Sequence, residues 1–136
     1  MEKVTHIIFA FLAFLILGLV LNFPIYMAFF AFFGALLPDI DMKIKGMHRK
    51  IFHNIWFLII ILFLGFKLGL DKFSAIALSI GFISHLISDS LTHRGIMPFW
   101  PIKKPRFNGP IKTGGLGEYL IIALLLLLIY LLGSVL

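Results

Sequence analysis

Histidine, aspartate and threonine share one helical stripe in the second half of this chain. His85 and Asp89 are four residues apart, and Thr92 follows three residues later. Side chains at this spacing lie on the same face of an α-helix, so all three can point at one target. An imidazole, a carboxylate and a hydroxyl on one face could bind a metal ion or take part in proton transfer.

A second cluster lies near the middle of the chain, directly after Pro38. There Asp39 and Asp41 flank one apolar residue, at a point where a helix is expected to end and a turn can aim both carboxylates inward. Two acids this close repel each other unless they are neutralised, and a divalent cation does this better than a flexible lysine.

The ligand types available narrow the choice of metal. The chain has no cysteine, so a thiolate metal site and a disulfide framework are both excluded. Imidazole and carboxylate ligands suit zinc, manganese or iron(II) better than calcium. We expect zinc first, as one or two ions, because the candidate ligands outnumber those of one tetrahedral ion.

The composition places these clusters in a membrane. Of the 136 residues, 61% are hydrophobic and 13% are charged, far from a soluble globular composition. The only extended polar stretch lies between Thr92 and Gly117, which leaves no room for a separate soluble domain. We therefore expect residues 1–136 to form a single membrane-embedded domain.

Five apolar segments predict an all-α integral membrane protein, a small bundle of about five transmembrane or re-entrant helices. The segments are Ile7–Leu21, Pro24–Leu37, Ile51 to about Leu70, Phe73–Leu91 and Leu116–Leu136. Each of the first two reaches about 21 to 23 Å at about 1.5 Å per residue, short of a hydrocarbon core of about 30 Å. An N-terminal signal peptide is the competing interpretation of the first segment, but Glu2 weakens its basic region and no small-residue cleavage site follows.

Alternating segments bring the chemistry-bearing residues to one face of the membrane. The N-terminus, the loop after Leu37, the loop after Leu91 and the start of the last helix then share a side, even if the first hairpin is re-entrant. That side holds nine residues of interest: His6, Asp39, Asp41, His48, His53, His85, Asp89, His93 and Glu118.

The basic residues orient the bundle. Ten of the twelve lie on the polar face and only Lys67 and Lys72 lie opposite, so the positive-inside rule makes the polar site and the N-terminus cytoplasmic. We expect a multi-pass protein of the cytoplasmic membrane with Leu136 outside. The net charge of +6 indicates anionic lipid headgroups as partners, and no nucleic-acid motif is present.

Each cluster also has a structural interpretation. The acids after Pro38 could be a solvated helix end, and His85 with Asp89 could be a hydrogen-bonded pair that holds helices together. His6 could be an interfacial histidine, and His48 and His53 could face headgroups from a loop. These structural interpretations are less convincing when the clusters are considered together. Independent structural histidines should be scattered over both faces of the membrane, and a lipid environment gives little reason to bring carboxylates toward them.

The motifs resemble those of the YdjM family over essentially the whole chain. They are Thr5-His6, Leu37-Pro38-Asp39-Ile40-Asp41, His48-Arg49 with His53, Ser84-His85 through Asp89-Ser90-Leu91-Thr92 with Gly95, Pro98-Phe99-Trp100-Pro101, Arg106-Phe107 and Glu118. Ser84 stands where a glycine is expected before the histidine, and His93 is not an expected family ligand.

The resemblance implies a function and a ligand set. YdjM proteins are described as LexA-regulated, membrane-bound, metal-dependent hydrolases. Their pattern implies metal ligands at His6, Asp39, Asp41, His53, His85 and Asp89, with His48 and Glu118 as further candidates.

Chemistry suggests roles for the remaining polar residues. A bound cation would lower the pKa of a water for attack on phosphorus or an acyl carbon. Glu118, where it is not a ligand, is the candidate general base, and Thr92 shares the stripe of His85. Arg49 could clamp an anionic oxygen, although a snorkelling topology charge explains it equally well.

The position of the site suggests a phospholipid, a lipid-linked phosphate or another membrane-proximal ester as substrate. The stretch 98–110 contains four prolines, aromatic Phe99, Trp100 and Phe107, and three basic residues, which suits a headgroup-facing surface. An ordinary positive-inside loop with aromatic anchors would have the same composition.

Two other function classes compete with a hydrolase. A metal-ion or proton-coupled transporter needs ionisable positions near mid-bilayer, and Ile55–Phe66 and Gly117–Leu136 carry no charge beyond Glu118. A structural protein needs small-residue packing stripes, and Gly65 with Gly69 is the only such pair in the third segment. That pair leaves a homo-oligomer open but does not explain the histidines.

Overall fold

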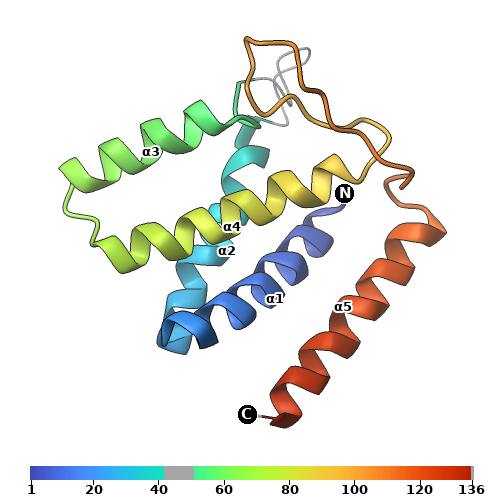
Figure 1. Cartoon of the computed structure of the whole chain (residues 1–136), viewed down its shortest axis with the longest axis horizontal. Helices are drawn as coiled ribbons and strands as arrows, with labels where there is room; N and C mark the ends of the chain where they lie inside the picture. The colour runs from blue at the N-terminus through green and yellow to red at the C-terminus, as the bar shows by residue number, and fades with distance from the viewer. Residues whose placement is uncertain (42–50, 136) are drawn as a thin grey trace.

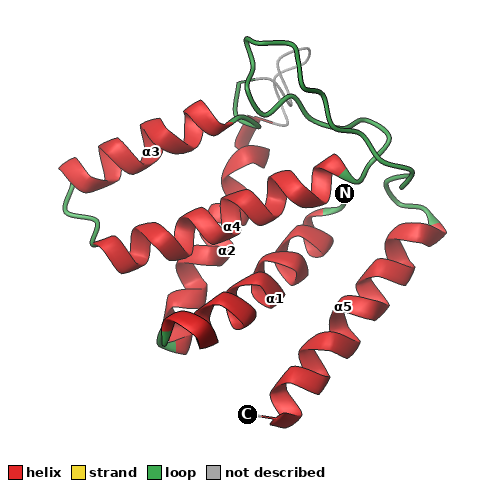
Figure 2. Cartoon of the chain, viewed as in Figure 1, coloured by secondary structure: helices red, strands yellow, loops and turns green. Residues whose placement is uncertain are grey.

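The computed structural model describes residues 1–41 and 51–135, which form helices joined by turns and one long loop (Figures 1 and 2). The α-helices are α1 (Lys3–Leu21), α2 (Ala28–Leu36), α3 (Ile55–Lys67), α4 (Lys72–Ser90) and α5 (Leu116–Val135), with short 3-10 helices η1 (Ile25–Met27) and η2 (Leu37–Asp41) on either side of α2. No β-strand occurs in the described residues. The expected all-α architecture with five helices is confirmed.

Three of the helices are long and apolar enough to cross a membrane: α1, α4 and the stretch Leu116–Ser134 of α5. The prediction that the first segment is too short was wrong, because α1 begins at Lys3 and has 19 residues, or about 28 Å at the α-helical rise. The segment Ile25–Ile40 and helix α3 are shorter apolar helices.

Side-chain caps set the ends of two helices. Asn54 caps α3 by accepting the N–H of Phe57 at 2.9 Å, so the helix starts four residues after the predicted Ile51. Asp71 caps α4 by accepting the N–H groups of Phe73 at 2.9 Å and Ser74 at 3.1 Å. The hydrogen bonds from the side chain and backbone of Ser74 lower the pKa of the Asp71 carboxyl below its usual value.

Helix α4 is the centre of the bundle and packs against α1, α2 and α3 (Figure 1). In an 18-residue apolar stretch of each helix, 67% of the residues are buried in α4, compared with 33% in α1 and 11% in α5. Helix α5 contacts α1 and leaves most of its leucines exposed. Lipid is the natural environment for such apolar faces in a membrane protein.

Two glycines let α2 and α4 approach each other at backbone distance. A Cβ atom on Gly81 would lie 1.8 Å from the carbonyl oxygen of Ala31, and one on Gly34 would lie 2.1 Å from that of Leu78. Each helix therefore places a glycine against the backbone of the other, which is a common way for membrane helices to pack closely.

The other glycine pair does not form a helical stripe. Gly65 lies within α3, but Gly69 lies beyond its end in a turn with φ of +93°. Glycine suits this left-handed conformation because it has no Cβ. Oligomerisation through Gly65 and Gly69 therefore has no continuous helix face to use, and a homo-oligomer stays a prediction.

Replacing Gly81 by valine should force α2 and α4 apart and lower the stability of the protein in detergent. Overpacking of this kind costs about 1 to 3 kcal/mol, and backbone contact places it at the upper end. Thermal unfolding in detergent measures the loss. Gly133→Val is the matched control, because a Cβ at Gly133 in α5 meets nothing within 4 Å. Equal melting temperatures for the two variants would contradict the packing described here.

Candidate metal centre

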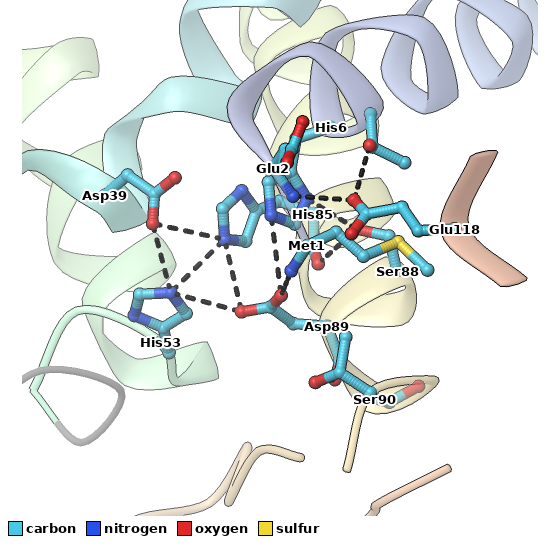
Figure 3. A network of polar contacts seen from close by, with 12 residues as sticks. Met1, Glu2, His6, Asp39, His53, His85, Ser88, Asp89, Ser90 and Glu118 are labelled. Carbon is cyan, nitrogen blue, oxygen red and sulfur yellow. Dashed lines mark hydrogen bonds and ion pairs between the residues drawn. The ribbon is translucent and has the colours of Figure 1, made fainter. Parts of the chain in front are cut away.

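Buried histidines and aspartates gather at one end of the bundle, close to the N-terminus (Figures 1 and 3). They come from the first turns of α1, from η2, from the turn before α3 and from the last turns of α4. The side chains of His53 and His85 are 0% exposed, those of His6 and Asp89 are 1% exposed, and that of Asp39 is 11% exposed. Polar groups buried this deeply need partners, because desolvation is costly.

A carbonyl group of α2 fixes the orientation of His85. Its Nδ1 lies 2.7 Å from the carbonyl oxygen of Ala35. A carbonyl only accepts hydrogen bonds, so Nδ1 must carry a proton, and in the neutral imidazole Nε2 then presents a lone pair to the centre. Histidine ligands of metals are commonly oriented through the second nitrogen in this way.

The turn before α3 positions His53. Asn54 bonds the carbonyl oxygen of Ile51 through Nδ2 at 2.6 Å while it caps the helix. The N–H of Ile55 bonds the carbonyl oxygen of Pro98 at 2.8 Å, which joins this turn to the loop before α5. His53 therefore sits between two restrained segments, opposite Asp39 and the end of α4 (Figure 3).

Asp39 and Asp89 both approach the same pair of imidazole nitrogens. Nε2 of His53 and Nε2 of His85 are 3.2 Å apart. Asp39 Oδ1 lies 3.7 Å from the first and 3.9 Å from the second, and Asp89 Oδ2 lies 3.6 Å and 3.7 Å from them. Ligands about 2.0 to 2.1 Å from zinc in a tetrahedron are about 3.3 Å from each other. The five separations lie within about 0.6 Å of that value, and Asp39, His53 and His85 together form a set compact enough to hold an ion.

His6 approaches the same centre from α1. Its Nδ1 lies 2.6 Å from Ser88 Oγ, and Ser88 donates its own proton to the carbonyl oxygen of His85 at 2.9 Å. Ser88 Oγ thus accepts from His6 Nδ1, which leaves the lone pair of His6 Nε2 facing Asp89 Oδ1 at 3.4 Å. The His6 ring stacks on that of His85, with centroids 3.7 Å apart.

Asp89 connects the two parts of the cluster. Its Oδ2 faces His53 and His85, whereas its Oδ1 faces His6 and the amino nitrogen of Met1, which lies 2.7 Å away. Two sets of three residues are each compact enough to hold an ion: His6, His85 and Asp89, and Asp39, His53 and His85. His85 belongs to both sets, so each is part of one continuous centre.

Glu118 lies beside this cluster with its carboxylate turned to the start of α1. Oε1 accepts the N–H of Glu2 at 2.6 Å and the hydroxyl of Thr5 at 2.5 Å, and Oε2 accepts the N–H of Gly114 at 2.7 Å. The side chain is completely buried. Its predicted roles as general base or ligand are not what these contacts favour, since both oxygens are already engaged.

The remaining predicted residues lie at the edge of the centre or outside the described residues. Thr92 is buried, and its hydroxyl donates to the carbonyl oxygen of Asp89 at 2.8 Å. His93 is exposed in the loop after α4. Asp41 ends η2, and its side chain is outside the described residues, as are His48 and Arg49. The roles predicted for Asp41, His48 and Arg49 stay predictions.

Three groups near the centre were missed from the sequence. Ser88 follows His85 at i+3 on the same helical stripe, so helical spacing could have found it. The carbonyl of Ala35 and the amino nitrogen of Met1 had no signal, because backbone groups carry no residue-type pattern.

Comparison with known proteins confirms the resemblance found in the sequence. The family model described as "YdjM inner membrane protein" matches residues 1–135. The chain is also similar to the "Uncharacterized protein YvsG" of Bacillus subtilis (strain 168), with 32% identity over 120 residues that cover 74% of this chain and 73% of that protein. No solved structure matches the chain.

Metal binding should stabilise the purified protein through the four convergent residues. Zinc at about 100 times its Kd is expected to stabilise the fold by about 2.7 kcal/mol, seen as a rise in melting temperature after chelator treatment and zinc addition. Asp39→Asn keeps the side-chain shape but removes the charge, so it should lose most of this rise. His93→Ala, which removes an exposed histidine, should keep it. An equal rise in Asp39→Asn and wild type would exclude this centre.

Proposed function

Because the chain belongs to the YdjM family of inner membrane proteins, we propose that its buried centre makes it a membrane-bound, metal-dependent hydrolase. The proposed substrate is a phospholipid, a lipid-linked phosphate or another ester at the membrane surface. The observation that carries the proposal is the approach of Asp39 and Asp89 to the Nε2 atoms of His53 and His85, with separations of 3.2 to 3.9 Å between the imidazoles and from each acid to them.

The donor set favours zinc, with manganese or iron(II) as alternatives, because two imidazole nitrogens and two carboxylate oxygens suit these ions. A divalent cation held there supplies a water of lowered pKa and a Lewis acid for the ester oxygen. The centre would hold one or two ions. A second ion is possible because Asp89 directs one oxygen toward His53 and His85 and the other toward His6.

The protein's own residues supply orientation and exclusion of water. The carbonyl of Ala35 fixes the His85 ring, and Ser88 fixes the His6 ring. Burial of these side chains keeps the local dielectric low, which strengthens their electrostatic interaction with a cation or an anionic substrate. Thr92 stays a candidate catalytic residue close to Asp89, and Arg49 a candidate anion clamp outside the described residues.

The loop between α4 and α5 supports a membrane-surface substrate. From residue 91 to residue 117 the sequence contains no acid, and all five basic side chains of this stretch are exposed, namely Arg94, Lys103, Lys104, Arg106 and Lys112. Phe99 and Phe107 are also exposed, at 39% and 49%. Basic and aromatic side chains of this kind favour anionic headgroups and the membrane interface.

The loop is also ordered against the candidate centre. Ile96 and Phe107 exchange backbone hydrogen bonds of 2.8 Å and 3.0 Å, and the N–H of Ile111 bonds the carbonyl oxygen of Leu91 at 3.1 Å. These bonds hold the basic stretch close to the end of α4, where His85 and Asp89 lie. A headgroup bound by the loop would therefore be near the proposed hydrolytic centre.

The test of this function combines metal analysis with ester hydrolysis. Purified wild type, His85→Ala and Asp39→Ala are compared for bound metal and for cleavage of phospholipids and phosphodiesters, with His93→Ala as the control. Wild type and His93→Ala should bind metal and cleave one substrate class, and the centre variants should lose at least about 100-fold in rate, since a directly bound ligand should matter more than an outer partner. The same sub-stoichiometric metal in wild type, His85→Ala and Asp39→Ala would end the proposal. Metal binding with ion flux into proteoliposomes and no ester cleavage would favour the transporter.

Sidedness is tested with reporter fusions. The positive-inside rule places the polar end in the cytoplasm, and α5 leads away from that end (Figure 1). A reporter fused after Leu136 should therefore be active outside the cytoplasm, and one in the loop 98–110 should be active inside it. A cytoplasmic signal from the fusion after Leu136 would overturn this orientation.

A further inference from the structure

Glu118 is a completely buried acid that joins the last helix to the first. Its carboxylate accepts three hydrogen bonds, from the backbone of Glu2, the hydroxyl of Thr5 and the backbone of Gly114. A carboxylate that receives three donors is strongly held in one place. These contacts account for the burial of its charge.

One of these bonds falls on a backbone group that a helix start leaves unpaired, the N–H of Glu2, and a second comes from the Thr5 hydroxyl in the first turn. Glu2 is the N-cap residue of α1, and its own side chain makes no capping bond. Free N–H groups and the positive end of the helix dipole need an acceptor of negative charge at this point. Glu118 supplies that acceptor from α5, so the cap of the first helix lies more than a hundred residues away in the chain.

The first turn of α1 also carries His6. Thr5 precedes it directly, and His6 contacts Ser88, Asp89 and the ring of His85. Fixing Glu2 and Thr5 on one side therefore fixes the direction from which His6 approaches α4. No comparable restraint comes from a side-chain cap within α1 itself.

We propose that Glu118 is a positioning residue that caps α1 from α5 and thereby holds His6 against the metal centre. The expected effect of Glu118 on metal binding rests on the proposed function. This role replaces proton transfer as the role of Glu118, because Oε1 accepts hydrogen bonds from Glu2 and Thr5 and Oε2 accepts one from Gly114 in the loop before α5. Rearrangement of these bonds would be needed before Glu118 could take a proton from water.

A double-mutant cycle tests whether Glu118 acts through His6. Glu118→Ala should weaken metal binding or activity by about 10- to 100-fold, the usual effect of losing an outer partner of a metal site. His6→Ala, which removes a candidate ligand, should weaken them by at least as much. The double variant should be no worse than His6→Ala alone, because residues that act through one another are not additive. Effects that multiply would overturn the proposal.

The control removes a nearby carboxylate while keeping the backbone N–H that bonds Glu118. The side chain of Glu2 is exposed, and only its backbone N–H bonds Glu118, so Glu2→Gln should leave metal binding unchanged. Thr5→Val removes a single donor and should give an intermediate loss, which Thr5→Ser should restore. These milder variants keep the test decisive if Glu118→Ala folds poorly.

A readout without metal separates this inference from the proposed function. Nitrogen NMR of histidine-labelled, metal-free protein reports the tautomer of each imidazole. The structure assigns the proton of His6 to Nδ1 through its bond to Ser88. Thr5→Val and Glu118→Ala should weaken that preference, whereas Glu2→Gln should not. An unchanged His6 spectrum in the first two variants would overturn the positioning role, and a wild type that binds no metal would overturn only the hydrolase.

Discussion

The structure depends on the neutralisation of two carboxylates inside an apolar bundle. Asp39 and Asp89 face each other across His53 and His85, and Asp89 also faces His6. Burying a charge without compensation costs several kcal/mol, and pairing alone often fails to recover that cost. Asp89 is paired with the amino nitrogen of Met1 at 2.7 Å. Together with the imidazoles, the two acids form sets of side chains that could hold a metal ion.

The close packing of α2 and α4 also determines the orientation of His85 in the candidate metal centre. The contacts at Gly34 and Gly81 let the two backbones touch, and Ala31 and Ala35 of α2 are completely buried against α4. The carbonyl of Ala35 can reach His85 only because α2 lies this close. A substitution that separates the helices should therefore disturb the tautomer of His85 together with the fold.

Helix α1 contributes His6 to the candidate centre, and α5 supports the start of α1 through Glu118. Helix α5 is mostly exposed along its length, but the acid at its start is completely buried. A helix with a charged residue at one end and leucines along the rest of its length is typical of a membrane helix that is anchored near the headgroups. The basic loop between α4 and α5 connects this anchored end of α5 with the surface at which the proposed lipid substrate would bind.

Much of this arrangement follows from the sequence. Hydropathy predicted the five helices, and alternation of apolar segments placed His6, Asp39, His53, His85 and Asp89 at one end, where the structure brings them together. The third segment was predicted to begin at Ile51, four residues too early, because hydropathy does not register the cap that the Asn54 side chain provides.

Only the tertiary structure decided how those residues meet. The sequence could not distinguish ligands from supporting groups, because that depends on distances between side chains far apart in the chain. Glu118 shows the reason: as a residue type it suits a base or a ligand, and three donors from α1 and the loop before α5 direct it elsewhere. Backbone partners such as the carbonyl of Ala35 have no residue-type signal, so only the packed helices reveal which nitrogen of His85 is available to a cation.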